Sequence, residues 1–215
     1  MDHYKYWDKL VRDIKECTKC RLHLGRKNAV PGSGRIDSGL MLIGEAPGAT
    51  EDELGLPFVG AAGKLLDSIL EELRTKREDL YITNVVKCRP PNNRQPARDE
   101  IDACSIYLES QILLIKPKVI VTLGAIAGEW VCSRMGIKWL GVTRMRGRIY
   151  RGRILGLPVT LVPTYHPAAI LRNRGEVEHL REDLETALRE LARMEESRDS
   201  GKERTLLDYM KGENK

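Results

Sequence analysis

The feature that most constrains the fold is an alternation of short apolar runs with amphipathic segments. Apolar runs, each the length of one buried strand, occur at residues 40–43, 81–86, 118–123 and 158–162. Apolar side chains recur at helical spacing in residues 4–16, 61–73, 96–115, 125–135 and 176–194. This alternation predicts an α/β fold, a single-domain three-layer sandwich around a central, mostly parallel four-stranded sheet.

Composition narrows the class of protein further. Hydrophobic residues make up 41% of the 215 residues, and the 31% that are charged have their signs interleaved, so we expect an ordered core. No run of about 18 apolar residues occurs, and the N-terminus has no apolar signal core. We therefore expect a cytoplasmic monomer without a membrane span. Glutamine occurs only at Gln95 and Gln111, which together with the abundant charge indicates a thermophilic source.

Parallel sheets of this kind bind ligands beyond the carboxyl ends of their strands. The loops after Ile43, Val86, Leu123 and Val162 should therefore carry the functional residues. The first loop is rich in glycine, but it contains neither G-x-x-x-x-G-K-[ST] nor G-x-G-x-x-G, which argues against a nucleotide cofactor. Its Phe58 either packs on the core or forms an aromatic platform for a flat ligand.

Two polar residues at strand ends are the strongest candidates for a site. Asn84 lies in an otherwise apolar strand, so its amide must bind either a neighbouring loop or a ligand. An amide offers a donor and an acceptor side by side, which suits the edge of a nucleobase. A lone histidine is more often structural, but His166 is expected to share its sheet edge with Glu45, Phe58 and Asn84. It is therefore a candidate catalytic imidazole.

Three motifs in this order resemble those of the family 4 uracil-DNA glycosylases, the iron–sulfur branch of the uracil-DNA glycosylase superfamily. They are GEAPG with PFVGAAG, TNVVKCRPP, and HPAAILRN. The likeness runs from about Cys17 to the helix near residue 190, which is most of the chain. Glu45 is an acid that family 5 enzymes lack, and the basic insert of the covalently trapping relatives is absent.

The resemblance implies a role in DNA base-excision repair. A uracil nucleotide turned out of the DNA would lose its base by hydrolysis of the N-glycosidic bond, leaving an abasic site. His166 would donate to uracil O2, in either its neutral or its cationic form, as the leaving group gains charge. Asn84 would bind the N3 and O4 edge and reject cytosine, while Phe58 would stack on the ring.

The residue that positions the attacking water is left open. The best-known relatives have an Asp one position after the residue matching Glu45, whereas this chain has Ala46 there. Glu45 or Glu51 could take that role, although Glu51 is also placed as an ordinary solvated acid at a helix start. On the sugar side, the resemblance implies a pocket lined by Glu45 and by the backbone of Gly44, Ala46 and Gly48.

Five cysteines without a secretion signal indicate metal ligands, catalytic thiols or core residues rather than disulfides. Cys17 and Cys20 form a CxxC pair, whereas Cys88 and Cys104 are single and distant. Zinc ribbons usually pair two CxxC knuckles, so four thiolates from scattered elements fit a [4Fe–4S] cluster better. The resemblance implies the same cofactor with these four ligands and a structural role. We expect Cys132 to lie in the core.

Arginines are concentrated between residues 142 and 154, where no acid occurs. Their spacing predicts a ribbon that turns near Arg151–Gly152, with three of them on one face of a strand: Arg144, Arg146 and Arg148. Such a face is either a charged edge strand that prevents aggregation or a surface that follows DNA phosphates. We expect single- or double-stranded DNA that contains uracil to bind here.

The residues after the His166 motif would extend that DNA-binding surface. Arg172 and Arg174 add positive charge directly beside the expected cleft. One of Ile170, Leu171 or Arg172 would fill the gap left by the flipped nucleotide, and we favour Leu171.

The chain divides into an expected glycosylase domain, residues 1–195, and a polar mobile tail, residues 196–215. Three apolar tail residues fall on one face of a helical turn: Leu206, Tyr209 and Met210. This pattern resembles the sliding-clamp binding peptide of replication and repair proteins, with Glu203 in place of its Gln and a methionine in place of its second aromatic. Alternatively, the turn folds back on the chain's own surface or stays disordered.

Two other classes of function fit parts of the pattern. One is a non-catalytic iron–sulfur module for DNA binding or polymerase association. Such a module would be free to lose some of the candidate site residues, so the presence of all of them argues against it. The other is a zinc hydrolase, but four Cys ligands would close its metal site, and no His, Asp and Glu cluster has catalytic spacing. Formation of abasic sites in a uracil-containing oligonucleotide would distinguish the three.

Overall fold

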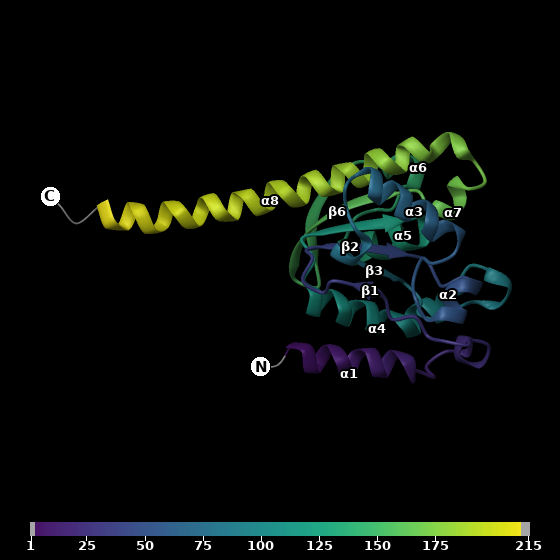
Figure 1. Ribbon diagram of the computed structural model, residues 1–215. Helices are drawn as coiled ribbons and strands as arrows, with labels where there is room; N and C mark the ends of the chain where they lie inside the picture. Colours follow the sequence, from purple (N-terminus) through teal and green to yellow (C-terminus); the bar gives the residue numbers. More distant parts are fainter. Residues whose placement is uncertain (1–2, 212–215) are drawn as a thin grey trace.

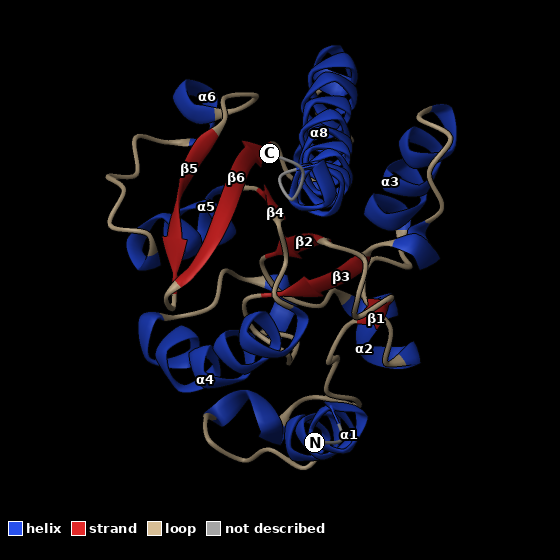
Figure 2. Cartoon of the chain, turned by 90° about the vertical axis from the view of Figure 1, so that its left-hand side faces the viewer, coloured by secondary structure: helices blue, strands red, loops and turns tan. Residues whose placement is uncertain are grey.

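A six-stranded mixed sheet forms the middle layer of the protein (Figures 1 and 2). This computed structural model describes residues 3–211, with the side chains of residues 4–173 and 175–197. Along the sheet the strands follow the order β1-β3-β2-β4-β6-β5. Their bounds are β1 Ser33–Gly34, β2 Leu40–Gly44, β3 Tyr81–Asn84, β4 Val119–Leu123, β5 Tyr150–Ile154 and β6 Leu157–Thr164.

The predicted α/β class is confirmed, but the predicted four-stranded sheet is wrong. The apolar runs correspond to β2, β3, β4 and β6, and these strands pair in parallel as predicted. β1 and β5 extend the sheet at its two edges with antiparallel pairings. An edge strand need not be buried on both faces, so it need not be apolar throughout. β1 has only two residues, and β5 alternates between half-buried and exposed side chains along most of its length.

Helices cover both faces of the sheet and complete the three layers (Figure 2). In β4, Val119, Val121 and Leu123 belong to one core and Ile120 to the other, which is why the strand is apolar throughout. The helices that cover the first core are α3 Ala61–Glu72, α7 Pro167–Ile170 and α8 Val177–Lys211. The second core is covered by α4 Arg98–Ile115, α5 Ala125–Arg134 and α6 Val142–Met145.

The N-terminal helix α1, His3–Lys15, packs against α4 and adds a third, smaller core. A further short helix, α2 Ala49–Leu54, lies in the loop after β2. Four 3-10 turns complete the part of the chain that the structure describes: Arg21–Leu24, Arg77–Asp79, Pro91–Asn93 and Arg174–Glu176. The sequence pattern predicts neither α2 nor α7, because one or two turns are too short to show helical periodicity.

The last helix is longer than predicted. Its apolar stripe predicts an end at Met194, but α8 continues to Lys211 and runs out beyond the sheet (Figure 1). The stripe marks only the part that packs on the sheet, where Leu180, Leu184 and Ala187 are buried. The clamp-type side chains lie outside the described ones, so the clamp peptide stays a prediction: Leu206, Tyr209 and Met210. Within residues 3–211, no helix is both long and apolar enough to cross a bilayer.

The arginine-rich segment does not form the predicted ribbon. Its first part is the helix α6, and only its last part is the strand β5. The turn lies at Leu155 and Gly156, which have φ values of 52° and 81°, rather than near Arg151–Gly152. Three residues are therefore not on one face of a strand, as the sequence predicts: Arg144, Arg146 and Arg148.

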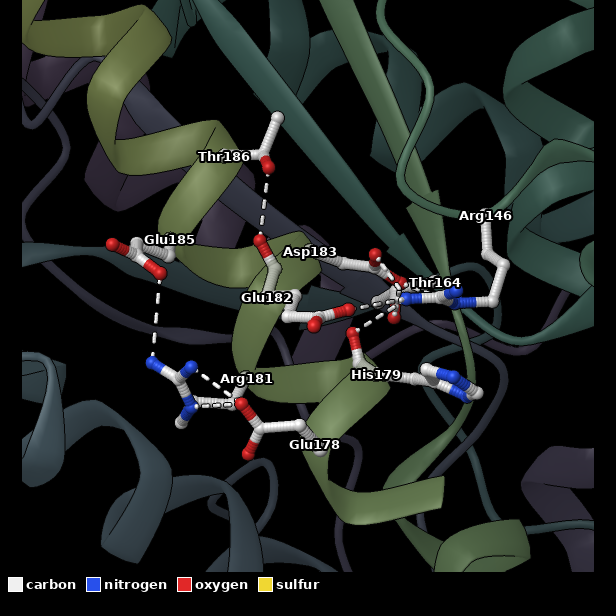
Figure 3. A network of polar contacts seen from close by, with 9 residues as sticks. All are labelled: Arg146, Thr164, Glu178, His179, Arg181, Glu182, Asp183, Glu185 and Thr186. Atoms are coloured by element: carbon white, nitrogen blue, oxygen red, sulfur yellow. Dashed lines mark hydrogen bonds and ion pairs between the residues drawn. The ribbon is translucent and has the colours of Figure 1, made fainter.

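Arg146 lies in an ion-pair network between α8 and the end of β6 (Figure 3). Its guanidinium donates to the two carboxylate oxygens of Asp183 at 3.0 and 2.7 Å and to the carbonyl of His179 at 3.0 Å. Asp183 is buried and also accepts a 2.6 Å hydrogen bond from Thr164 Oγ1. The structure thus places Arg146 in a bidentate internal pair, not on the open surface where DNA contact is predicted.

The network has a consequence for the site, because Thr164 is the last residue of β6 and His166 follows it closely. Asp183 binds the side chain of Thr164, while the Thr164 carbonyl accepts from Gly124 N at 3.0 Å. The end of β6 is therefore held both by α8 and by the loop after β4. This arrangement fixes the point at which the chain leaves the sheet toward His166.

We expect Arg146→Ala to lower the free energy of unfolding by about 3 kcal/mol, because it leaves the buried Asp183 carboxylate without its cation. Arg144→Ala is the matched control, since Arg144 is exposed, and it should change stability by less than about 0.5 kcal/mol. Guanidinium chloride unfolding curves measure both. Equal midpoints for the two variants would contradict the structural role of Arg146.

Candidate functional site

The carboxyl ends of the four parallel strands meet at one edge of the sheet, where a cleft opens. Glu45 follows β2, Asn84 ends β3, Gly124 follows β4, and His166 lies just beyond β6. The cleft has a volume of about 450 Å³. The predicted site residues that line it are Glu45, Ala46, Gly48, Glu51, Phe58, Asn84, His166 and Arg172. The predicted location at the strand ends is thus the place where these residues come together.

The side chain of Asn84 contributes an unused acceptor to the cleft. Asn84 is 1% exposed, and its Oδ1 has no hydrogen-bond partner within the described residues. A buried oxygen without a partner costs free energy, and a ligand that donates to it removes that cost. The alternative prediction, in which the Asn84 side chain holds a neighbouring loop, is not supported at Oδ1, because no described residue donates a hydrogen bond to this oxygen.

Gly44 provides the space for this amide. Gly44 lies opposite Asn84 in the parallel register of β2 and β3. A Cβ at Gly44 would lie 2.4 Å from Asn84 Oδ1 and 2.5 Å from Phe58 Cζ, far inside contact distance. Any larger residue would therefore displace the amide, the phenyl ring or both.

Phe58 is buried and also forms part of the cleft wall. Its ring centroid lies 5.5 Å from that of His166, with 31° between the ring planes. Its φ of 51° is in the left-handed region, which side chains of this size rarely adopt. Arg77 stabilises this loop by donating to the carbonyls of Phe58 and Pro57 at 3.0 and 2.7 Å, and it pairs with Asp67. Packing on the core and stacking on a ligand are both compatible with this position.

His166 caps the N-terminus of α7, and this contact determines its tautomer. Its Nδ1 accepts from the backbone N–H of Ala168 at 3.1 Å, so in the neutral ring the proton is on Nε2. Burial lowers the pKa of His166 to about 4, and the charge of Glu51 opposes part of that shift. At neutral pH the ring is therefore uncharged, with an Nε2–H available as a donor.

Glu51 holds the loops of the cleft together. Its Oε1 accepts from the backbone N–H groups of Val59 and Gly60 at 2.9 and 2.8 Å, and its Oε2 accepts from Gly48 N at 3.1 Å. The side chain is half-buried in the first turn of α2. Glu51 is therefore not the solvated helix-start acid of the alternative prediction.

The carboxylate of Glu45, unlike that of Glu51, is not engaged in hydrogen bonds with the described residues. Glu45 lines the cleft, and no ion pair from a described residue reaches its carboxylate either. Burial raises the pKa of Glu45 above its usual range. An unshared, desolvated carboxylate is a stronger base than an exposed one, and it is free to bind a water or a ligand.

One wall of the cleft was not predicted; it consists of Pro90, Asn93, Arg94 and Gln95. Asn92 and Asn93 have left-handed φ values of 53° and 54°. Arg94 donates to both oxygens of the buried Glu100 at 2.8 and 2.7 Å, which lowers the pKa of that carboxyl to about 2. The sequence PPNNRQP is a clear turn signal, and its place directly after β3 could have pointed to the cleft.

The residues directly after His166 form α7, of which Ala168 and Ala169 line the cleft. Leu171 is 43% exposed, whereas Ile170 is fully buried and therefore cannot fill a gap in DNA. Arg172 lines the cleft. The side chain of Arg174 lies outside the described ones.

Four cysteines line a second cavity beside α1. Cys17 and Cys20 follow α1, Cys88 follows β3, and Cys104 lies in α4. Cys132 is fully buried in the second core, where the sequence predicts it. The four candidate ligands are thus brought together from three separate parts of the chain.

Nitrogen donors surround these sulfur atoms. Arg26 Nη1 donates to Cys88 Sγ at 3.1 Å, and the backbone N–H groups of Lys19 and Lys87 donate to Cys17 Sγ and Cys104 Sγ at 3.4 and 3.3 Å. Hydrogen bonds of this kind stabilise the negative charge of thiolate ligands in metal centres.

The chemistry of these side chains suits an iron–sulfur centre. In such a cluster each iron is bound by its own thiolate, so the ligands surround a space, and here four thiols line one cavity. Cys17, Cys20, Cys88 and Cys104 are therefore the residues that could hold such a group.

The sequence is similar to those of known proteins. Residues 31–192 match the model of the uracil DNA glycosylase superfamily. The chain is 53% identical over 171 residues to a type-4 uracil-DNA glycosylase of Pyrobaculum aerophilum, covering 78% of this chain and 87% of the relative. It is 48% identical over 186 residues to the type-4 uracil-DNA glycosylase of Sulfurisphaera tokodaii, a match that covers 86% of this chain and 84% of the relative. With the type-4 uracil-DNA glycosylase of Archaeoglobus fulgidus the identity is 41% over 204 residues, which covers 94% of this chain and 98% of the relative.

We expect His166 to remain neutral, with its proton on Nε2, down to a pH of about 4, because burial disfavours the imidazolium. Two-dimensional ¹⁵N NMR of the imidazole measures both the tautomer and the midpoint. In Glu51→Gln the midpoint should fall further, because the carboxylate charge that favours the cation is gone. A midpoint near the unperturbed value of about 6.5 would contradict this description of the site.

Proposed function

This chain belongs to the uracil DNA glycosylase superfamily and, within it, to the type-4 enzymes, and from this premise we propose that it excises uracil from DNA. The reaction is hydrolysis of the N-glycosidic bond of a flipped nucleotide, which leaves an abasic site for base-excision repair. The observation that carries the proposal is the unsatisfied Oδ1 of Asn84, in the same cleft as the neutral His166. An acceptor and a donor are thus arranged for the polar edge of one pyrimidine.

Asn84 supplies the choice of base. Uracil carries a hydrogen on N3, which would donate to Asn84 Oδ1, while the amide nitrogen of Asn84 would donate to O4. Cytosine has an acceptor at N3 and an amine at C4, so both contacts would be lost. Leaving buried polar groups unpaired in this way typically discriminates by a factor of about 10⁴.

His166 stabilises the leaving group. As the glycosidic bond breaks, negative charge develops on the uracil ring, and an Nε2–H aimed at O2 stabilises it. A neutral imidazole needs no buried positive charge before the reaction begins, which agrees with the lowered pKa of His166. Phe58, tilted by 31° against this imidazole, would hold the base by stacking.

Glu45 is the residue that we assign to the attacking water. Its carboxylate is unshared and lies in the cleft, whereas the carboxylate of Glu51 already accepts three backbone hydrogen bonds. Glu45 can therefore orient a water at C1′ and accept its proton. Glu51 would act indirectly, by holding the loops that carry Gly48 and Gly60.

DNA contact is assigned to the surface around the cleft mouth. Arg172 and Arg94 are the cations that line the cleft, and the exposed Arg144 and Arg148 can add phosphate contacts. Leu171, exposed at the end of α7, is the side chain that we expect to enter the gap left by the flipped nucleotide.

The cysteine cavity is proposed to hold a [4Fe–4S] cluster with a structural role. When bound, the cluster would supply four covalent links that join the segment after α1, the loop after β3 and the helix α4. Support comes from the four thiols and from their N–H donors. Purified protein should contain about four irons per chain, and iron-free protein would refute this part of the proposal.

The end of α8 is proposed to bind a sliding clamp through Leu206, Tyr209 and Met210. This idea comes from the sequence pattern, in which the three residues recur at the spacing of one helical face. A clamp contact would raise the local concentration of the enzyme on replicated DNA without changing its chemistry.

The rival function, a DNA-binding module without catalysis, is disfavoured by the cleft. Such a module needs neither an unsatisfied buried amide nor a desolvated carboxylate, and both cost stability. The two functions differ in one observable, the formation of abasic sites. Alkali cleavage of a labelled oligonucleotide that contains one uracil measures it directly.

We predict that Asn84→Ala and His166→Ala each lower the single-turnover excision rate by at least about 100-fold. The first variant loses the acceptor for N3–H, and the second loses the donor for the leaving group. Circular dichroism and iron content serve as controls for folding. If both variants excise uracil at the rate of the unchanged chain, the assignment of the cleft as the active site is wrong.

Deletion of residues 200–215 should leave excision on short oligonucleotides unchanged and abolish binding to the cognate clamp, because the cleft and the tail are separate. Titration calorimetry with the full chain should give a dissociation constant in the micromolar range. The matched variant Leu206→Ala/Tyr209→Ala changes only the proposed contact face. Clamp binding of equal strength by this variant would rule out the proposal.

A further inference from the structure

Lys87 is a fully buried lysine that lies between the two sites. It is 1% exposed, and its Nζ donates three hydrogen bonds of 2.7 Å, to Thr83 Oγ1, to the carbonyl of Asn84 and to Gln111 Oε1. An ammonium has three N–H donors, so each of them has a partner. A network this complete fixes the position of every group in it.

The acceptors of Lys87 are themselves held in place. Gln111 Nε2 donates to the carbonyl of Pro31 at 2.7 Å and to Tyr81 Oη at 3.0 Å, and Thr83 Oγ1 donates to the same carbonyl at 2.7 Å. Neither amide end of Gln111 nor the hydroxyl of Thr83 can therefore turn away. The ammonium is the common centre of these bonds.

The other side of Lys87 contacts the cysteine cavity. Its backbone N–H donates to Cys104 Sγ at 3.3 Å, and the next residue in the chain is Cys88. Lys87 itself lines the cysteine cavity, as do both of these cysteines. One residue therefore contacts the proposed cluster ligands with its main chain and the base-reading strand with its side chain.

No carboxylate balances the charge of this ammonium. Among the described residues, Lys87 forms no ion pair, and its three acceptors are all neutral. Burial opposes the charged form and lowers the pKa of Lys87 to about 7, whereas the three acceptors around its Nζ call for the ammonium, so a counter-charge nearby is needed. Four thiolates around an iron–sulfur cluster carry net negative charge, and Cys88 and Cys104 are the members next to Lys87.

The contact with the Asn84 carbonyl is at a critical position. Asn84 is the last residue of β3, and after it the chain leaves the sheet. The ammonium binds the carbonyl of the same residue whose Oδ1 is unsatisfied in the cleft. The peptide after Asn84 is thus held at both ends, since its carbonyl accepts from Lys87 Nζ and its N–H, that of Val85, donates to the carbonyl of Gly44 at 2.9 Å. Lys87 therefore contributes to the orientation of the residue whose side chain faces the cleft.

We propose that Lys87 is a positioning residue that joins the cysteine cluster to Asn84, so that recognition of the base depends on the integrity of the cluster. The proposal rests on the proposed function. When bound, the cluster would supply the negative charge opposite Lys87, and Lys87 orients Asn84 through its hydrogen bond to the Asn84 carbonyl. Lys87 contacts neither the base nor the reacting atoms.

The decisive experiment is a double-mutant cycle of Lys87→Met and Asn84→Ala, with the metal-loaded chain. Methionine keeps the length and removes the charge. We expect Lys87→Met to lower single-turnover excision at least about 10-fold and to weaken binding of free uracil by a similar factor. In the Asn84→Ala background the same substitution should cost almost nothing further, because the amide that Lys87 orients is gone.

Two measurements that do not depend on activity accompany the cycle. Lys87→Met should keep its iron, and the reduction potential of its cluster should be more negative, since removing a neighbouring positive charge favours the oxidised form. Lys118→Met is the matched control, because Lys118 pairs with Glu195 far from both sites, and it should change neither quantity. An unchanged potential in Lys87→Met would overturn the role of the ammonium as counter-charge.

The outcomes separate the failure of this inference from that of the proposed function. If the unchanged chain makes no abasic sites, the proposed function fails, and the potential measurement still tests Lys87. If the unchanged chain is active and the effects of Lys87→Met and Asn84→Ala multiply, the two residues act independently and the inference is wrong. Should Lys87→Met not fold, Thr83→Val replaces it in the cycle, because it removes one acceptor and keeps the buried charge, and multiplicative effects would again overturn the inference.

Discussion

The parallel register of β3, β2, β4 and β6 is the constraint on which the site depends. It places Gly44 opposite Asn84, and Leu123 opposite Thr164, so that all four strands end at the same edge. A slip of one residue in any pair would turn the side chains of that strand to the opposite face. Because both faces of these strands are buried, such a slip would put the wrong side chains into both cores. The packing of the cores thereby also aligns the groups in the cleft.

Burial away from water explains the shifted pKa values of the titratable groups in the cleft. The same burial lowers the pKa of His166 and raises that of Glu45, since both changes favour the uncharged form. In the same region, three backbone N–H groups donate to the carboxylate of Glu51. Asn84 Oδ1 has no such partner. The cleft thus contains one carboxylate that is fully engaged and polar groups that are free to meet a ligand.

The sequence predicts those parts of the molecule that depend on local pattern. Continuous apolar runs identify the four parallel strands, and the polar residues at their ends identify Asn84 and His166 as neighbours. The edge strand β1 was missed because two residues give no such run, and β5 was predicted only as part of a longer arginine-rich ribbon with its turn in the wrong place. The alternation of Arg144, Arg146 and Arg148 was misleading, because residues 142–145 form a helix and Arg146 forms an internal ion pair with Asp183. Contacts between distant residues, such as Glu51 with Val59 or Lys87 with Gln111, leave no periodic signal.

The long α8 has a geometric consequence for anything that binds its far end. From residue 195 to residue 211 the helix adds roughly 25 Å at about 1.5 Å per residue, which makes this segment a spacer of defined length. A helix also turns by about 100° with each residue, so its length and its rotational phase cannot change independently. Inserting one residue would turn the far end through more than a quarter of a circle. Inserting seven would nearly restore the original direction while moving the far end about 10 Å outward.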